Sequence, residues 1–457
     1  MLTAIKNVLQ DKFTLTLWMN HLLIIYAFLF PISLYASSFI FSLILILFVV
    51  RRNFKEYLLP IIKKDVIQAF ILFFLIHILW LYGTENFILA KHSINVVKYL
   101  LFPIIFFSFI DKNFSKYIVT GFIAGMLFSE LFSYALQFHI LPSEYSIAKI
   151  PIYTVYAIGD PSPFLHHSHY AASLAFVAVL LIYKYIRMTL TTFEKLISLF
   201  FIISISINLS LVGGRIGYIL YIVLILFLVT FIYRKKLLIP LLIFTIMMSG
   251  FFALAYNFSP LFQSKVVQTK NTLNGFLHGK MDFTTSLGAR VGFWYYSTTV
   301  IKENLILGVG TGDYMDAVQK IIPESKNNYF IKHKLEHPHN IYIQLLLQFG
   351  VIGLFIFFYL IYKIIRQETK SEYMQFIKYS IILTILIALL TETFIFRYYL
   401  PVFILLISTT LASNSYIEDN TIVFSKTTVQ IYALLLLLSI INAKLPYIII
   451  FFKTLIG

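Results

Sequence analysis

The chain has 457 residues, of which 60% are hydrophobic and only 12% are charged, with a formal net charge of +16. An ordinary soluble domain carries roughly a quarter charged residues, so this composition excludes a water-soluble globular protein. The absence of cysteine excludes disulfide bonds, a thiol nucleophile and cysteine-ligated metals. Lys and Arg fall mainly in short connections between apolar runs, which indicates membrane topology and argues against nucleic-acid binding.

Apolar runs of roughly 17 to 25 residues recur along the chain, and each is long enough to cross a bilayer as a helix. The first run lacks a small-residue cleavage site, and we interpret it as a retained span. We therefore predict an all-α, polytopic integral membrane helical bundle with twelve or thirteen transmembrane helices, because Lys444 and Pro446 interrupt the last run. The expected spans are 17–34, 37–50, 66–82, 94–110, 117–138, 169–186, 196–212, 217–233, 237–256, 341–361, 379–395, 398–412 and 429–452.

The distribution of basic residues predicts the orientation of these spans. With the N-terminus inside, the cytoplasmic segments hold twenty Lys and Arg residues, whereas the short outward loops hold four. The same face then carries 139–168, the Gly213-Gly214-Arg215 turn, 257–340 and 392–397. The stretch 257–340 is far longer than an ordinary connection, and its aromatic and glycine content predicts an ordered subdomain with short helices. The predicted parts are 1–256 with about nine spans, 257–340 as a large outer loop, and 341–457 with three to four spans.

Arg215 follows two glycines between two apolar spans and has no acidic neighbour in the sequence. A guanidinium at a membrane boundary is costly unless it meets an anion or water. It is therefore either an interfacial anchor that reaches lipid headgroups or a group that binds an anionic ligand. Gly213 and Gly214 favour the second interpretation, because they let a backbone or a bulky ligand approach closely.

Arg290 is predicted near the start of a helix that carries Trp294 on the same face one turn later. It forms either a salt bridge within the loop or a contact with an anionic ligand. The downstream run Gly308-Val309-Gly310-Thr311-Gly312 resembles a dinucleotide-binding loop only superficially, since no βαβ unit precedes it. We interpret this run as a tight turn that shapes a cavity.

His337, His339 and Asn340 directly precede a long apolar helix. Pro338 favours a turn before helix entry, and Asn340 is a plausible N-cap. Imidazole is suited to proton transfer near neutral pH, and a helix N-terminus favours an anionic ligand. A single histidine is more often structural, but two of them on the face that holds both arginines favour a catalytic site.

Two further groups are weaker candidates. His166, His167 and His169 open a span from the same face, where they line an acceptor groove, bind a metal or lie at the interface. A metal is the least favoured of these, because no carboxylate stands at a suitable spacing. Glu392 and Arg397 form a possible structural pair.

The C-terminal element resembles the O-antigen ligase and O-antigen polymerase superfamily of bacterial envelope glycosyltransferases. The ligase pattern is His, then Asn, Ser or Gln, nine residues, Gly, two residues, and Gly, Thr or Tyr. His339, Asn340, Gly350 and Gly353 match it. Arg215 after a Gly-Gly turn, and Arg290 before Trp294 and GVGTGD, are similar to the two arginine elements of the family, so the resemblance covers roughly 200–365.

The resemblance implies a multi-span bundle with a large periplasmic loop, similar to membrane glycosyltransferases of the C type, in the bacterial inner membrane. It implies an active site that faces the periplasm, an undecaprenyl-diphosphate-linked glycan as donor and lipid A-core or another glycan as acceptor. His339, Arg215 and Arg290 would be catalytic. His337, Asn340, Trp294, Gly214, His167 and His169 would bind substrate.

The chemistry of these residue types agrees with that implication. Departure of a lipid diphosphate develops negative charge, which two guanidinium groups stabilise, while an imidazole takes the proton of the acceptor hydroxyl. Attack opposite the diphosphate inverts the anomeric carbon. Asp313 and Asp316 lack the spacing of an Asp-x-Asp metal motif, so we expect an inverting reaction with no metal and no cofactor.

Three alternatives stay open. A polymerase would extend lipid-linked glycan instead of transferring it to lipid A-core. A transporter of lipid or polysaccharide would also need many spans and a cationic cavity, but transporters commonly place polar residues near the membrane midplane, whereas here they gather at one face. A protein O-oligosaccharyltransferase would use a protein hydroxyl as its acceptor.

Overall fold

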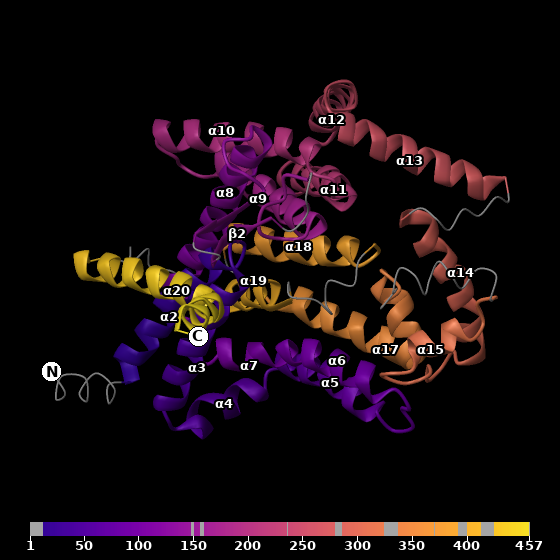
Figure 1. The fold of residues 1–457 in the computed structure, drawn as a ribbon, viewed down its shortest axis with the longest axis horizontal. Helices are drawn as coiled ribbons and strands as arrows, with labels where there is room; N and C mark the ends of the chain where they lie inside the picture. The colour runs from indigo at the N-terminus through magenta and orange to yellow at the C-terminus, as the bar shows by residue number, and fades with distance from the viewer. Residues whose placement is uncertain are drawn as a thin grey trace.

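The computed structural model describes residues 12–147, 150–155, 160–234, 236–278, 286–323, 337–369, 371–391, 400–412 and 425–456. These residues are almost entirely helical (Figure 1). The first helices are α2 (Lys12–Leu29), α3 (Leu34–Val50), α4 (Phe54–Ile62), α5 (Asp65–Leu79), α6 (Phe87–Val97), α7 (Phe102–Phe106), α8 (Ser115–Gln137), α9 (His167–Arg187), α10 (Thr192–Leu211) and α11 (Arg215–Ile232), with 3-10 turns η1 (Lys98–Leu101) and η2 (Lys112–Phe114). The later ones are α12 (Leu238–Phe258), α13 (Pro260–Leu277), α14 (Ser286–Glu303), α15 (Tyr314–Gln319), α17 (Ile341–Arg366), α18 (Glu372–Ala388), α19 (Leu400–Ala412) and α20 (Lys426–Ile456).

Among the described residues, nine helical segments are long and apolar enough to cross a membrane. The pair α3 and α4 adds a tenth if it is one span, and it bends by 111° between the two helices. Helices α5 and α19 are apolar but shorter. The prediction of a polytopic helical membrane protein is therefore confirmed, and the predicted twelve or thirteen spans include these shorter helices.

The bounds of two predicted spans differ from those of the helices. The run expected as one span over 94–110 consists of α6, η1 and α7 in succession, and together they form one candidate span, Phe87–Phe106. Pro103 stands at the start of α7, where the missing N–H is tolerated. The last helix, expected to be interrupted at Lys444 and Pro446, runs continuously as α20 from Lys426 to Ile456.

Among the described residues, one element is not helical, and it lies in the segment 139–168. Strands β1 (Glu144–Ile147) and β2 (Ile150–Thr154) form an antiparallel pair, with Tyr145 opposite Tyr153. Aromatic and β-branched residues alternate along these strands, and such residues favour a pleated, half-exposed surface. The pair precedes α9 and lies in the segment predicted to face outward.

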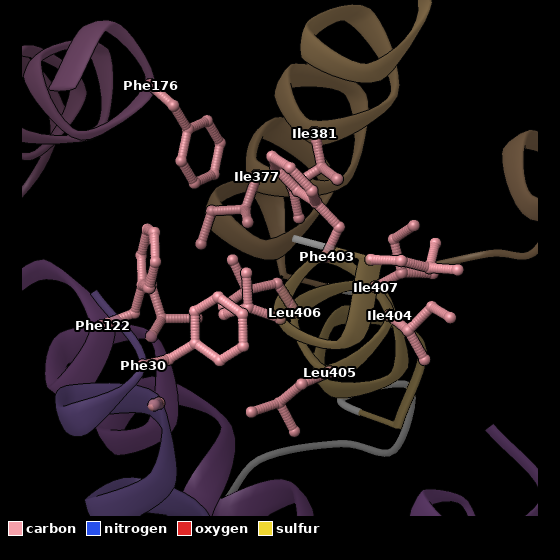
Figure 2. Packing of buried hydrophobic residues seen from close by; sticks show 14 of the residues in the cluster. Phe30, Phe122, Phe176, Ile377, Ile381, Phe403, Ile404, Leu405, Leu406 and Ile407 are labelled. Atoms are coloured by element: carbon pink, nitrogen blue, oxygen red, sulfur yellow. The ribbon is translucent and has the colours of Figure 1, made fainter. Parts of the chain in front are cut away.

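Helix α19 occupies the centre of the bundle. Its side chains from Leu400 to Leu411 are buried, and in Figure 2 Phe403 and Leu406 face the helices α8, α9 and α18. A helix that is apolar on every side is expected to be surrounded by other helices. Helix α19 is therefore enclosed by neighbouring helices, among them α7, α8 and α18.

Polar contacts identify which helix ends lie together. Arg187 at the end of α9 bonds to Glu372 at the start of α18 at 3.2 Å, so these helices are antiparallel. Lys363 near the end of α17 contacts Asp65 at the start of α5 at 2.7 Å. These ends belong to segments predicted to be cytoplasmic, and they share one face. The compartment that this face meets stays a prediction.

Helix α17 is broken at Gly350, where φ is +61°. The loop 305–310 pairs with the opened turn through three backbone hydrogen bonds. These are Val309 N–H to Leu347 O (2.8 Å), Gly310 N–H to Gln348 O (3.0 Å) and Val351 N–H to Leu305 O (2.9 Å). The left-handed conformation favours glycine, which accounts for a glycine at this position of the motif.

Candidate functional site

The N-termini of α9, α11 and α17 lie at the same end of the bundle. Gly214, the residue before α11, packs so closely on α9 that a β-carbon there would lie 2.5 Å from the carbonyl oxygen of His167. The N–H of Ile341 at the start of α17 donates to the carbonyl of Leu389, which directly follows α18. Because α18 is antiparallel to α9, all three N-termini point to one face. Such termini favour anionic ligands.

The Gly213-Gly214-Arg215 turn is fixed by contacts on both sides. The N–H of Gly213 donates to Oδ2 of Asp160 at 3.0 Å, and the hydroxyl of Tyr218 donates to the carbonyl of Val212 at 2.7 Å. The two glycines were expected to admit either a backbone or a ligand, and at Gly214 the structure places the backbone of α9. The turn therefore sets the position of Arg215.

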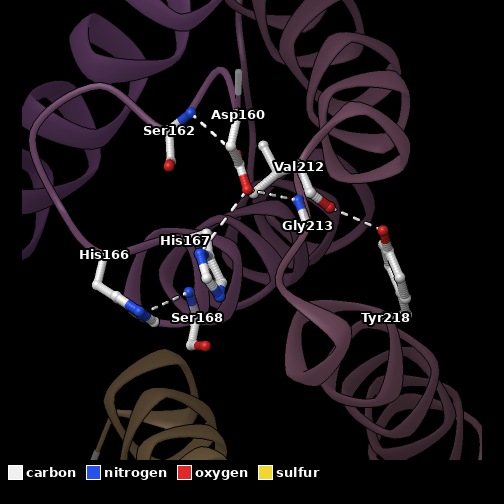
Figure 3. Close-up of polar contacts among 8 residues, drawn as sticks. All are labelled: Asp160, Ser162, His166, His167, Ser168, Val212, Gly213 and Tyr218. Atoms are coloured by element: carbon white, nitrogen blue, oxygen red, sulfur yellow. Dashed lines mark hydrogen bonds and ion pairs between the residues drawn. The ribbon is translucent and has the colours of Figure 1, made fainter. Parts of the chain in front are cut away.

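Asp160 was not singled out from the sequence, although it organises this turn (Figure 3). Its Oδ1 accepts the N–H of Ser162 at 3.2 Å, and its Oδ2 lies 3.8 Å from Nδ1 of His167. The carboxylate is only 14% exposed. The one sequence signal was a carboxylate followed by Pro161 and Ser162, which is typical of a turn in which Asp bonds to its own backbone.

Helix α13 contributes two polar side chains to the same face. Nη2 of Arg215 donates to Oε1 of Gln268 at 3.1 Å. Lys265 lies one turn earlier, near Gly213 and Asp160. Burial and the charge of Arg215 lower the pKa of the Lys265 amine, while Asp160 opposes that effect. The stretch 257–340 was predicted to contain short helices, and in its described part α13 and α14 each have 18 residues.

Arg290 lies on α14, as the sequence predicted, with Trp294 one turn later. Its positive charge interacts electrostatically with that of Arg215, which belongs to another helix. Nε1 of Trp294 donates to the carbonyl of Pro338 at 2.7 Å. Helix α14 thus connects the arginines to the segment that carries His337 and His339.

The histidine segment forms a tight turn before α17. The N–H of His339 donates to Nδ1 of His337 at 3.3 Å, and the two rings are 4.2 Å apart. The backbone of His339 has φ +52°, a conformation that side chains other than glycine rarely adopt and that clusters at functional sites. Asn340 accepts the N–H of Ile343 at 3.1 Å, which confirms its predicted role as N-cap.

The second histidine group opens α9. Nδ1 of His166 accepts the N–H of Ser168 and caps the helix, and its ring lies 4.0 Å from that of His167. The side chain of His167 is 33% exposed, whereas His169 is only 8% exposed. His167 and His169 were both predicted to bind substrate, and His167 is the more exposed of the two. Both assignments stay predictions.

The glycine-rich run and the nearby carboxylates are structural. Thr311 N–H donates to the carbonyl of Trp80 at 3.1 Å, so the run joins α5 as well as α17. Asp313 accepts the N–H groups of Glu85 and Asn86 before α6, and Asp316 accepts the side-chain amide of Asn86 at 2.8 Å. These interactions account for both aspartates without a ligand. The Glu392 and Arg397 pair lies outside the described residues.

These features define a polytopic helical membrane protein in which Arg215, Arg290 and Lys265 lie toward the end of the bundle where α9, α11 and α17 begin. Residues 197–358 match a protein-family model described as O-antigen ligase, so the suspected family is confirmed over a segment that includes Arg215, Arg290 and His339. Ligases of this family are glycosyltransferase-like enzymes that use lipid-linked glycans. A search of curated proteins found no match.

Proposed function

We propose that this protein is an O-antigen ligase. It transfers a glycan from undecaprenyl diphosphate to a sugar hydroxyl of lipid A-core on the periplasmic face of the bacterial inner membrane. The observation that carries this proposal is a pair of contacts of α14: the charge of Arg290 interacts with that of Arg215, and Trp294, one turn after Arg290, donates a hydrogen bond to the carbonyl of Pro338 next to His339. These groups come from three separate elements, and an anionic ligand between the arginines would relieve the repulsion of their charges.

The reaction forms one bond and breaks one. The acceptor hydroxyl oxygen attacks the anomeric carbon, the bond from that carbon to the diphosphate oxygen breaks, and its electron pair leaves with the diphosphate. Arg215 and Arg290 stabilise this developing charge through charge-assisted hydrogen bonds. Attack opposite the leaving group inverts the anomeric carbon, and the guanidinium groups take the place that a divalent cation has in other transferases.

The hydroxyl proton passes to an imidazole. Nδ1 of His337 already accepts the N–H of His339 within the turn, which supports His339 as the base and His337 as a group that holds the turn. Asn340 and Trp294 then position the turn, and His167 contacts the substrate from α9. In this proposal, residues 1–256 and 341–457 form the membrane domain and 257–340 the periplasmic subdomain.

Reconstituted membranes test this function. The donor is an undecaprenyl-diphosphate-linked glycan, supplied either with lipid A-core or alone, and products are separated by size for wild type, Arg215→Ala and His339→Ala. Matched controls are Arg234→Ala, an exposed arginine that follows α11, and His278→Ala, an exposed histidine that follows α13.

Transfer to lipid A-core that is lost in both site variants and kept in both controls supports the ligase and its site. A ladder of lengthening lipid-linked glycan in the absence of lipid A-core overturns the ligase in favour of a polymerase. Absence of any transfer by the wild type overturns both enzyme assignments in favour of a transporter.

A further inference from the structure

Lys265 places a third cationic side chain beside the Gly213-Gly214-Arg215 turn. A β-carbon on Gly213 would lie 3.7 Å from Cε of Lys265 and 2.7 Å from Oδ2 of Asp160, so both side chains border the same glycine. Gln268, three residues after Lys265 and on the same side of α13, accepts the hydrogen bond from Arg215. Lys265 is therefore half-buried on the side of α13 that contacts Arg215.

Asp160 supplies the negative charge beside Lys265. It contacts His167 at 3.8 Å and holds Gly213 through a hydrogen bond, and its negative charge favours the protonated amine of Lys265. The cluster therefore contains one carboxylate and three positively charged side chains, those of Arg215, Arg290 and Lys265. A counter-ion within a cationic site stabilises that site while no ligand is bound.

The charge of a departing diphosphate increases during the proposed reaction. Each phosphate of a lipid-linked donor is a diester with one negative charge, whereas the released diphosphate ends in a phosphate with a charge of about −1.5 to −2 near pH 7. The two guanidinium groups balance the two negative charges of the donor diphosphate. The additional negative charge of the leaving group can be stabilised by a third cation. An interaction that strengthens along the reaction accelerates it.

We propose that Lys265 is a diphosphate-binding residue that stabilises the leaving group, and that Asp160 is its positioning residue and its counter-ion in the empty site. This proposal rests on the proposed function. Asp160 releases Lys265 when the diphosphate enters, while its hydrogen bond to Gly213 continues to hold the turn before Arg215.

The first test measures equilibrium binding of undecaprenyl diphosphate to the full-length protein in nanodiscs. Lys265→Met removes the charged ammonium group but keeps an unbranched chain as far as Cε, and we expect it to weaken binding by roughly tenfold. Lys265→Arg keeps the charge and should bind like wild type. Lys270→Met is the matched control, because Lys270 is an exposed lysine of the same helix.

Equal binding by wild type and Lys265→Met, both with unchanged thermal unfolding, overturns the assignment of Lys265 while leaving the proposed function intact. If undecaprenyl diphosphate binds neither wild type nor the Lys265→Arg variant, both proposals fail. The steady-state rates give a second readout, since loss of a contact to the leaving group lowers kcat more than it raises KM.

The second test concerns Asp160. In Asp160→Asn the single amide oxygen can still accept the N–H of Gly213, although the contact with the N–H of Ser162 is lost. Because the competing charge is gone, undecaprenyl diphosphate should bind a few-fold more tightly. Combining Asp160→Asn with Lys265→Met should reduce this gain, because the two residues are coupled. If Asp160 has a purely structural role, Asp160→Asn should bind undecaprenyl diphosphate more weakly than wild type, and that result overturns the counter-ion assignment. The assignment is also overturned if Asp160→Asn increases the affinity equally in the wild type and in Lys265→Met.

Discussion

The indole Nε1 of Trp294 donates a hydrogen bond of 2.7 Å to the carbonyl oxygen of Pro338, across 44 residues of sequence. This single contact joins the helix of Arg290 to the turn of His337 and His339. The arginine and the candidate base therefore keep a defined relative position. Catalysis that relies on positioned groups is sensitive to displacements of about 1 Å.

Trp294→Phe should lower kcat by up to roughly tenfold, because it removes a hydrogen bond whose net contribution is about 0.5 to 1.5 kcal/mol while it keeps the aromatic ring. Transfer rates and thermal unfolding are measured together. The control is Tyr295→Phe, which alters the exposed neighbour on α14. An unchanged kcat in Trp294→Phe would show that the contact does not position the histidines.

Gly350→Ala should destabilise the protein by about 1 to 3 kcal/mol or more, since the residue has φ +61° and a β-carbon would collide with the carbonyl of Ile306. Gly250→Ala in α12 is the matched control, because a β-carbon there meets no atom within 4 Å. That substitution should stabilise slightly, as alanine favours a helix. Unfolding in detergent, followed by temperature or denaturant, compares the two, and equal stabilities would contradict the strained turn.

Glu130 on α8 is fully buried, and one of its carboxyl oxygens accepts a hydrogen bond from Ser204 on α10. Its other oxygen has no hydrogen-bond partner among the described residues. Glu130→Gln keeps an acceptor and should change stability little, whereas Glu130→Ala leaves the hydroxyl of Ser204 without that acceptor and should cost about 1 to 3 kcal/mol. Nearly equal unfolding temperatures for the two variants would argue against a structural role of this contact.

Removal of divalent cations should leave transfer unchanged. Asp313 and Asp316 already accept hydrogen bonds from the segment before α6, and the arginines supply positive charge at the site. Initial rates are compared before and after dialysis against EDTA, and after return of Mg²⁺ or Mn²⁺. A loss of activity that either cation restores would show that a metal takes part.

Local patterns predicted much of this site. The capping role of Asn340 and the shared face of Arg290 and Trp294 follow from helix geometry, which depends on residues a few positions apart. The apolar runs predicted a multi-span bundle, because lipid requires helices. They did not predict α4, which lies in an expected connection, or the division of the run 94–110 among α6, η1 and α7.

Features that depend on distant segments were not predicted. Asp160 acts on Gly213, 53 residues away, and no local pattern distinguishes it from an ordinary turn residue. The same holds for Lys265, whose position depends on how α13 packs beside α11. The break of α17 at Gly350 is stabilised by hydrogen bonds to the loop 305–310. The glycine alone indicates an unusual backbone conformation, but it does not identify the segment that bonds to the broken turn.

The broken turn of α17 also has a mechanical consequence. The loop 305–310 is hydrogen-bonded into the helix on both sides of Gly350, so the first part of α17 cannot tilt independently of α14. Movement of α14 at Trp294 is therefore coupled to α17 through these hydrogen bonds. We expect any widening of the site to occur on the other side of Arg215, where the hydrogen bond from Arg215 to Gln268 joins α11 to α13.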